Sequence, residues 1–362
     1  MVFSYLVRIQ RIEILGIAKL DYPVHTLDNR LILPAGAELT PEIMDELIAT
    51  NKGASYKTFS LLEYGSVYQD MLHSLQNPPY NVIFESLNRT VTITLMKKIR
   101  FIQPILKFLD YFKKSDFYTY RHSLVVLALS TIMARTLLEE PKDWITEVMA
   151  GTIHDFGKIC VPLDTLKKNE PLNREERNIL VHHSLAGFVL LSYYLQDCWS
   201  FAARVAKEHH ERRDGSGYPL GISLKDRMVE IIAVCDVYDA LLSPRPYRPT
   251  AYDNRTALEE ITGMAQEGKL SWEVVQCLVS HNRKDRPPFR ETKVSTEKRG
   301  TPPANNLYGV VVEKELKCPN CHGSSIKKKT YKEDVKNISY ECRNCGKEFD
   351  EDDLINIEMD EY

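Results

Sequence analysis

The sequence has little net charge and no apolar run long enough to cross a membrane as a helix. Its 47 lysines and arginines nearly balance 50 acidic residues, which gives a formal net charge of −3. No overall basic charge therefore draws the chain to nucleic acid or to an anionic membrane surface. The longest apolar stretch runs only from Leu124 to Ala134, well short of the roughly 20 residues that span a bilayer. The beginning of the chain also has no basic region before an apolar one and no small-residue cleavage site. We expect a cytoplasmic protein without a membrane segment.

The eight cysteines fall into two groups that differ in spacing. Four are scattered singly through apolar contexts and are expected to be reduced core thiols: Cys160, Cys198, Cys235 and Cys277. The others form two CxxC pairs: Cys318 with Cys321, and Cys342 with Cys345. In a chain that is not secreted, this spacing indicates a metal site, and it is typical of a four-cysteine zinc ribbon. One structural zinc would then fold a module too small to be stable alone; a redox or regulatory role for the thiols is the alternative. His322 is expected to be a bystander, because four thiolates already complete the tetrahedron.

The pattern of polar and apolar residues divides the chain into three regions and a linker. Residues 1–80 read as a small α+β module, with strand signals between turn residues and a helix capped by Thr40 and begun by Pro41. Residues 81–285 read as a helical bundle, because apolar residues recur at three- and four-residue spacing over 91–114, 122–138 and 144–159. A further helix is expected to begin near Asn173. Residues 286–310 form a polar linker rich in proline, and 311–362 hold the zinc ribbon and an acidic tail. The fold class predicted is therefore mainly α.

Histidines are scarce, but most of the ten lie in the helical region beside other metal-ligand types. The candidates are His122, His154, Asp155, His182, His183, His209, His210 and Asp236. Buried neutral histidines and buried carboxylates are costly unless they are paired or bind a metal. Imidazoles suit iron, manganese, zinc or nickel, and a carboxylate can bridge two ions. Asp155 directly follows a histidine and is the natural bridging residue, whereas Asp236 would reach one ion from a different helix. Two ions about 3.5–4 Å apart can lower the pKa of a bridging water and hold a phosphoryl group for in-line displacement.

Four sequence motifs carry a resemblance to a known family. They are HDFGK at 154–158, HSLAG at 183–187, HHERRDGSGYP at 209–219 and DVYDALLSPRPYR at 236–248. In family order over about residues 85–285, they resemble the motifs of HD-GYP domain proteins, the HD phosphohydrolases that cleave cyclic di-GMP. Ser184 stands where the family usually has proline.

The resemblance implies a set of metal ligands. They are His122, His154, Asp155, His183, His209, His210 and Asp236. One ion would take His122, His154, Asp155 and Asp236, and the other would take Asp155, His183, His209 and His210. His182, one residue off the motif, is expected to face away. Iron or manganese is the expected active-site metal.

The resemblance also implies residues that act on substrate. Lys158 would contact the scissile phosphate, where an ammonium offsets the charge that develops in the transition state. Its alternative role is a favourable interaction with the dipole at the C-terminus of a helix. Tyr218, Arg245 and Arg248 match positions that contact the dinucleotide, through stacking or through bidentate guanidinium contacts. Lys158 and Asp155 are thus the predicted catalytic residues. Asp239 is expected to fix local structure, and Glu211 to support a metal-bound histidine.

One position departs from the family pattern. Members with a third metal carry a glutamate four residues before the first histidine, but here that residue is Tyr118, and the nearest acid is Asp116. We therefore expect a binuclear site. The departure leaves open whether hydrolysis stops at linear pGpG or continues to GMP.

The function predicted is a metal-dependent cyclic di-GMP phosphodiesterase that works through two ions and a bridging hydroxide, typical of a bacterial signalling enzyme. The alternatives are a catalytically weak cyclic di-GMP-binding scaffold and a phosphohydrolase for another dinucleotide, such as cyclic GMP-AMP or pGpG. Expected partners are cyclic di-GMP and either a protein or a second copy of the chain, bound through the N-terminal module or the zinc ribbon. The segment NRLILPAGAELT at 29–40 resembles a small module that often precedes HD-GYP domains, which implies an input role. A nucleic-acid partner is not expected, because the acidic tail follows the basic residues of the ribbon.

Overall fold

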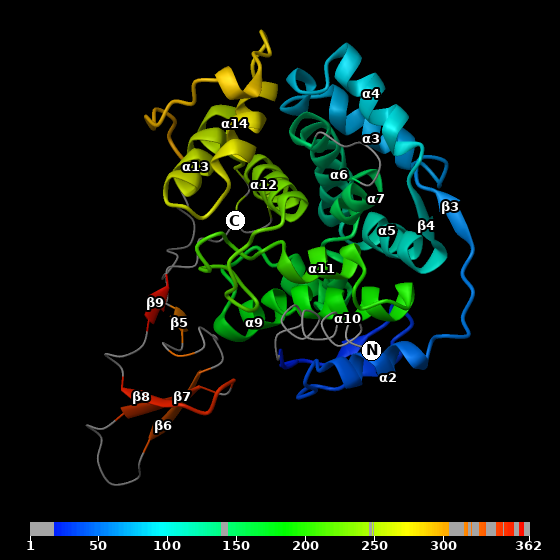
Figure 1. The fold of residues 1–362 in the computed structure, drawn as a ribbon, viewed down its shortest axis with the longest axis vertical. Coiled ribbons are helices and arrows are strands. Elements are labelled where there is room, and N and C mark those ends of the chain that lie inside the picture. Colours follow the sequence, from blue (N-terminus) through cyan, green and yellow to red (C-terminus); the bar gives the residue numbers. More distant parts are fainter. Residues whose placement is uncertain are drawn as a thin grey trace, which may run out of the picture.

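The chain folds mainly into helices in a computed structural model. The structure describes residues 18–138, 144–245, 248, 250–303, 315–317, 320, 326–330, 338–342, 344–350 and 355–357. The elements up to Cys160, just after the HDFGK motif at 154–158, are β1 (Val24–His25), β2 (Leu31–Leu33), α2 (Pro41–Ala49), β3 (Thr58–Ser60), α3 (Val67–Gln76), η1 (Tyr80–Val82), α4 (Ser86–Met96), β4 (Arg100–Ile102), α5 (Gln103–Ser115), α6 (Phe117–Leu137), α7 (Trp144–Val148), η2 (Met149–Thr152) and η3 (Phe156–Cys160). The elements that follow are α8 (Leu163–Leu166), α9 (Arg174–Val181), α10 (His183–Leu195), α11 (Phe201–Glu208), α12 (Arg227–Leu242), α13 (Asn254–Gln266), α14 (Trp272–His281), η4 (Phe289–Glu291), β5 (Glu315–Lys317), β6 (Ile326–Thr330), β7 (Ile338–Cys342), β8 (Glu348–Asp350) and β9 (Ile355–Ile357). The mainly helical fold class predicted from the sequence is confirmed (Figure 1).

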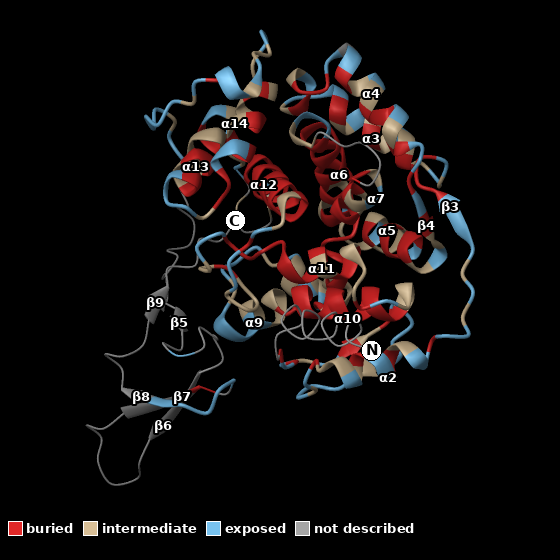
Figure 2. Ribbon diagram, viewed as in Figure 1, coloured by how far each residue is buried: buried red, intermediate tan, exposed pale blue. Residues whose placement is uncertain are grey.

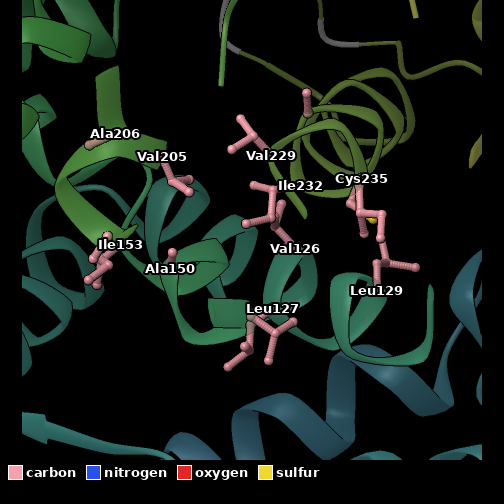
Figure 3. Close-up of a cluster of buried hydrophobic side chains, with 14 of the residues drawn as sticks. Val126, Leu127, Leu129, Ala150, Ile153, Val205, Ala206, Val229, Ile232 and Cys235 are labelled. Atoms are coloured by element: carbon pink, nitrogen blue, oxygen red, sulfur yellow. The ribbon is translucent and has the colours of Figure 1, made fainter. Parts of the chain in front are cut away.

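Helices α6 and α12 pack against each other in the helical region. α12 is buried along its length from Met228 to Leu242, and α6 is buried almost throughout its middle (Figure 2). A helix that is apolar on every side is stable only when neighbours cover it all round. Figure 3 shows side chains of α6, α11 and α12 meeting those of residues 150 and 153 in one apolar cluster. The segments that carry the candidate site are therefore held on a rigid core.

The N-terminal part packs directly against the helical region. β1 and β2 pair antiparallel, and α2 begins as predicted, with Pro41 in its first turn and the Thr40 side chain accepting from the Ile43 amide. β3 pairs antiparallel with β4, across the boundary expected at residue 80. Asn51 Nδ2 donates to the carbonyl of Tyr193 on α10 at 2.8 Å. Packing is therefore continuous from this part into the helices that carry the site.

Two segments predicted as continuous helices are interrupted. The 91–114 segment divides into α4, β4 and α5, and Pro104 lies in the first turn of α5. The 144–159 segment leaves α-helical geometry after Val148 and continues as η2 and η3. Gly157 allows η3 to lie against α10, because a Cβ at this position would lie 1.9 Å from the His183 carbonyl oxygen. The close approach of η3 to α10 brings the HD motif beside His183.

Residues 286–303, predicted as part of a polar linker, lie against α13 and α14 within the described part of the chain. Gln276 Nε2 donates to the carbonyl of Thr292, which is buried, at 2.9 Å. The amides of Arg299 and Gly300 donate to the Glu259 carboxylate at 2.9 and 2.7 Å. This segment is thus anchored by side-chain and backbone hydrogen bonds.

The described C-terminal strands form two small antiparallel sheets, β6-β7-β8 and β5-β9. Cys342 is buried at the end of β7, and the following turn returns the Gly346 amide to the Cys342 carbonyl at 2.8 Å. Gly346 has a φ of 71°, in the left-handed region that favours glycine. Cys345 is exposed in this turn, while Cys318 and Cys321 lie outside the described residues. The predicted zinc ribbon therefore stays a prediction.

Among the described residues, one window, Arg174–Leu195, is long and apolar enough to span a membrane by length and hydropathy. Two-thirds of it is buried within the fold, and it contains two helices, α9 and α10. Core helices of folded domains pass the same test, so the window is weak evidence for a membrane segment.

Candidate metal centre

The seven predicted metal ligands come together from five segments of the chain. His122 lies on α6, His154 and Asp155 lie between η2 and η3, His183 begins α10, His209 and His210 follow α11, and Asp236 lies on α12. All seven side chains are buried. They form two groups, within each of which the ligand atoms lie within 4.8 Å of one another: His122, His154 and Asp236 in the first, and Asp155, His183, His209 and His210 in the second.

In the first group the ring nitrogens and the carboxylate face one another. His122 Nε2 lies 3.2 Å from His154 Nε2 and 3.1 Å from Asp236 Oδ1. His154 Nε2 lies 3.9 Å from the same Asp236 oxygen. Three potential ligand atoms thus surround one point.

Asp155 lies between the two groups. Its Oδ1 is 3.3 Å from His183 Nε2 and 3.9 Å from His209 Nε2 in the second group. Its Oδ2 is 3.4 Å from His154 Nε2 in the first group. One carboxylate oxygen therefore faces each group, which is the arrangement that a bridging ligand requires.

Hydrogen bonds at the opposite side of each ring fix the direction of the Nε2 lone pairs. Nδ1 of His154 donates to the Gly151 carbonyl at 2.8 Å, and Nδ1 of His183 donates to the Leu180 carbonyl at 2.6 Å. His209 Nδ1 lies 3.0 Å from two carbonyls of α11. A neutral imidazole that donates through Nδ1 has a lone pair at Nε2.

The lone pairs of His183 and His209 face each other, with the two Nε2 atoms 3.3 Å apart. Two acceptors cannot hydrogen-bond to each other, but a cation placed between them would satisfy both. The donor set of the described residues therefore fits divalent metal ions.

Burial also favours the protonation states that bind metals. It lowers the pKa of His183 to about 4 and that of His209 to about 3, so both rings are neutral near pH 7. Burial alone would raise the pKa of Asp155, but the nearby Lys158 ammonium helps to hold it well below its usual range. Neutral imidazoles and ionised carboxylates are the forms that coordinate cations.

His122 is oriented by a second carboxylate. Its Nδ1 donates to Asp239 Oδ2 at 2.6 Å, while Arg121 donates to the same oxygen at 3.0 Å. The Tyr80 hydroxyl also donates to Asp239. Asp239 thus holds a candidate ligand in place; the sequence did not indicate Tyr80 or Arg121 as its partners, because they lie far away along the chain.

Glu211 binds the backbone of the loop that follows the two histidines. Its carboxylate accepts from three successive backbone amides, those of Leu220 at 2.7 Å, Gly221 at 3.1 Å and Ile222 at 3.1 Å. Glu211 thus holds the loop that carries Tyr218, and its expected support of a metal-bound histidine stays a prediction.

Tyr218 lies against a candidate ligand. Its ring stacks on His210, with the centroids 4.5 Å apart and the planes 20° from parallel. A Cβ at the neighbouring Gly217 would lie 2.4 Å from the Glu211 Cα, so this loop requires a glycine to pack so closely. Tyr218 was expected to stack on guanine, but one face of its ring already covers His210.

A cavity opens beside both groups of ligands. Its lining comprises Asp116, Tyr118, Thr119, Asp155, Lys158, Thr165, Leu166, Leu172, Leu180, His183, His210, Tyr218, Asp236 and Arg245. Lys158 Nζ lies 2.7 Å from Asp155 Oδ2. The predicted residues Lys158, Tyr218 and Arg245 therefore share one cavity with candidate metal ligands.

Two predicted residues outside this lining make structural contacts. The Arg248 guanidinium donates to the carbonyls of Leu241 at 3.1 Å and Ser243 at 3.3 Å, where α12 ends. His182 packs edge-on against Tyr22, with ring centroids 5.5 Å apart. The contacts of Arg248 stabilise the end of α12.

Comparison with known proteins places the site in context. Residues 106–273 match the family described as HD domain. A cyclic di-GMP phosphodiesterase of Pseudomonas aeruginosa is 41% identical over 142 residues, which are 38% of this chain and 33% of that protein. A cyclic di-GMP phosphodiesterase of Thermotoga maritima is 35% identical over 201 residues, 53% of each chain. A 3'3'-cGAMP-specific phosphodiesterase of Vibrio cholerae is 31% identical over 176 residues, 47% of this chain and 39% of that protein.

The chain spans about half the length, or less, of these curated relatives. Among solved structures, a HDG"Y"P protein from Bdellovibrio bacteriovorus has a TM-score of 0.38 and 16% identity, over 73% of this chain and 95% of that chain.

Proposed function

We propose that the HD domain over residues 106–273 gives this chain the activity of a metal-dependent cyclic di-GMP phosphodiesterase. The observation that carries the proposal is the convergence of seven buried ligand side chains in two groups, with Asp155 facing both. Curated homologues of this domain are named cyclic di-GMP phosphodiesterases, which supports the substrate. We further propose that the centre binds two ions, iron or manganese.

When bound, two such ions would supply an acidified water nucleophile and positive charge for the phosphoryl oxygens. The residues of the chain prepare the cavity for this chemistry. The hydrogen bonds at Nδ1 of His154 and His183 aim both Nε2 lone pairs inward. The Lys158 ammonium forms an ion pair with Asp155 in the cavity wall. From there it can offset negative charge on a phosphate in the cavity.

The other lining residues bind and orient substrate. Arg245 adds a second cation to the cavity, and a guanidinium can hold a phosphate through two hydrogen bonds. Tyr218 closes one side of the site by covering His210. We propose hydrolysis of cyclic di-GMP to pGpG, to GMP or to both.

Two alternatives differ in chemistry. One is a catalytically weak cyclic di-GMP-binding scaffold, in which the metal groups would serve binding. The other is hydrolysis of another dinucleotide, which is favoured by the similarity to a phosphodiesterase named as specific for 3'3'-cGAMP.

One experiment separates these functions. The protein is purified without oxygen, its metals are counted, and hydrolysis of cyclic di-GMP, 3'3'-cGAMP and pGpG is followed by chromatography. We expect two ions at the active site and conversion of cyclic di-GMP, both lost in Asp155→Asn. The exposed Asp285→Asn is the matched control and should keep both. Binding of cyclic di-GMP without turnover would favour the scaffold, and faster turnover of 3'3'-cGAMP would favour the second alternative.

We also propose one structural zinc in the C-terminal module, held by Cys318, Cys321, Cys342 and Cys345. The turn after Cys342, closed by Gly346, supports this, because it resembles a loop folded around a sulfur ligand. A protein partner or a second copy of the chain is proposed to bind at this module or at the N-terminal part, and the setting is proposed to be cytoplasmic.

A further inference from the structure

We infer that Tyr118 is a positioning residue that holds the Arg245 guanidinium in the cavity for an anionic group of the substrate. This inference rests on the proposed function, because it concerns the same cavity. It assigns to Tyr118 a role in substrate affinity that differs from those of the metal ligands.

Three side chains form a stack that leads from the metal centre to the cavity. The Tyr118 ring lies nearly parallel to that of His122, with centroids 5.6 Å apart and planes 14° from parallel. Arg245 Cζ lies 5.1 Å from the centroid of the same Tyr118 ring. Tyr118 and Arg245 both line the cavity. The tyrosine therefore connects a candidate ligand, which is fixed by Asp239, to a cation beside the substrate.

Arg245 needs such support because it follows α12 in an irregular segment. Its backbone is paired with that of Arg248 through two hydrogen bonds of 2.9 Å, and Arg248 is in turn fixed to the end of α12. These contacts place the main chain of Arg245, but its side chain still has several rotatable bonds. A cation over an aromatic face is attracted by the quadrupole of the ring. The Tyr118 ring thus favours one position of the guanidinium and reduces the conformational entropy that substrate binding must remove.

The charges in the cavity show what this cation can bind. The lining contains two cationic side chains, Lys158 and Arg245, among the carboxylates Asp116, Asp155 and Asp236. Lys158 is paired with Asp155 at 2.7 Å. A cyclic dinucleotide carries two phosphodiesters. When one lies at the metal groups and Lys158, the other needs a second cation, and Arg245 is placed to receive it.

The inference is tested by replacing Tyr118 with two different side chains. Tyr118→Phe keeps the aromatic face, whereas Tyr118→Leu keeps apolar packing on His122 but removes the π face. We expect Tyr118→Leu to raise KM for cyclic di-GMP roughly three- to tenfold. It should raise equally the Kd for a phosphorothioate analogue that resists hydrolysis, with kcat and metal content close to those of the unmodified protein. Tyr118→Phe should change neither constant by more than about twofold.

A double-mutant cycle with Arg245→Gln identifies the partner. If Tyr118 acts through Arg245, Tyr118→Leu should have no further effect on Kd in the Arg245→Gln background. Phe289→Leu is a matched control, because Arg290 lies over Phe289 at 5.5 Å in the same type of contact and neither residue lines the cavity; it should leave Kd unchanged.

The opposite results are equally clear. Tyr118→Leu could instead lose bound metal or kcat, and keep that loss in the Arg245→Gln background. This result would overturn the inference, because Tyr118 would then act on His122. Equal Kd values for Tyr118→Leu and the unmodified protein would also overturn it. If the unmodified protein binds the analogue but hydrolyses no dinucleotide, the proposed function fails, while the cycle still measures the coupling between Tyr118 and Arg245.

Discussion

Asp239 Oδ2 accepts a 2.6 Å hydrogen bond from His122 Nδ1, and both side chains are buried beneath the candidate metal centre. This bond points His122 Nε2 at His154. Asp239→Asn should therefore weaken metal binding by about 10- to 100-fold, because a carboxylate behind a ligating histidine orients the ring and raises its basicity. Titration of the metal-free variant with Mn²⁺ measures this. Asp285→Asn, at an exposed position, should bind Mn²⁺ as the unmodified protein does, and an equal affinity for Asp239→Asn would contradict the orienting role.

Glu211 organises the loop of the GYP motif through three backbone amides. Glu211→Ala would leave these partly buried donors without their acceptor. We expect the free energy of unfolding to fall by about 1–3 kcal/mol and KM to rise, because Tyr218 would lose its fixed position on His210. Urea unfolding and steady-state kinetics measure the two effects. Glu63→Gln, at an exposed position, should change neither, and an unchanged KM for Glu211→Ala would show that the loop keeps its position without the carboxylate.

Gly157 allows η3 and α10 to approach closely enough for Asp155 and His183 to meet. Its added Cβ would lie 1.9 Å from the His183 carbonyl oxygen and 2.4 Å from the Gly187 amide nitrogen. Gly157→Ala should therefore push the two segments apart, and we expect it to lose bound metal and at least about 2 kcal/mol of stability. Metal analysis and thermal unfolding measure both losses. Gly53→Ala is the matched control, because nothing lies within 4 Å of its Cβ position; similar behaviour of the two variants would refute the steric explanation.

The part of the candidate site that could be predicted from the sequence is the part whose metal-ligand residues lie next to one another in short motifs. His154–Asp155 and His209–His210 are adjacent in the chain, and their residue types alone suggest a metal. The helix beginning at Pro41 was likewise predictable, because its capping residue and first-turn proline are local signals. The grouping of the ligands was available from the family resemblance, and the structure brings the same residues together.

The remaining features depend on contacts between distant segments. The contact of η3 with α10 at Gly157 joins segments that are separate in the chain, and helical periodicity over 144–159 did not indicate that α7 ends at Val148. The pairing of Asp239 with Tyr80 joins positions 159 residues apart, and no local pattern indicates it. Glu211 and Arg248 lie within motifs, but their roles come from the backbone groups that they meet in the folded chain.

The C-terminal cysteines should control a metal that is separate from the active site. Cys342→Ser should lower the zinc content by about one equivalent, because a four-thiolate site loses most of its affinity for zinc when one of the four thiolates is removed. Phosphodiesterase activity and the iron or manganese content should remain. Metal analysis of the purified protein measures each element. Cys160→Ser, a half-buried single cysteine, should keep its zinc, and full zinc content in Cys342→Ser would contradict the ribbon.

The metal-free protein should lose stability as the pH falls below about 6.5. In the folded chain, burial lowers the pKa of His183 to about 4 and that of His209 to about 3, from an ordinary value of 6.5. As the pH falls from about 6.5 towards 4, the unfolded chain binds protons at these histidines and the folded chain does not, so the free energy of unfolding decreases. The contribution is present above pH 6.5 and is lost through this window. Urea midpoints of chelated protein at about pH 7.5 and about pH 5 measure the decrease. His209→Gln should make it smaller, whereas His73→Gln, at an exposed position, should leave it unchanged. An equal decrease in both variants would show that His209 is not held neutral by burial.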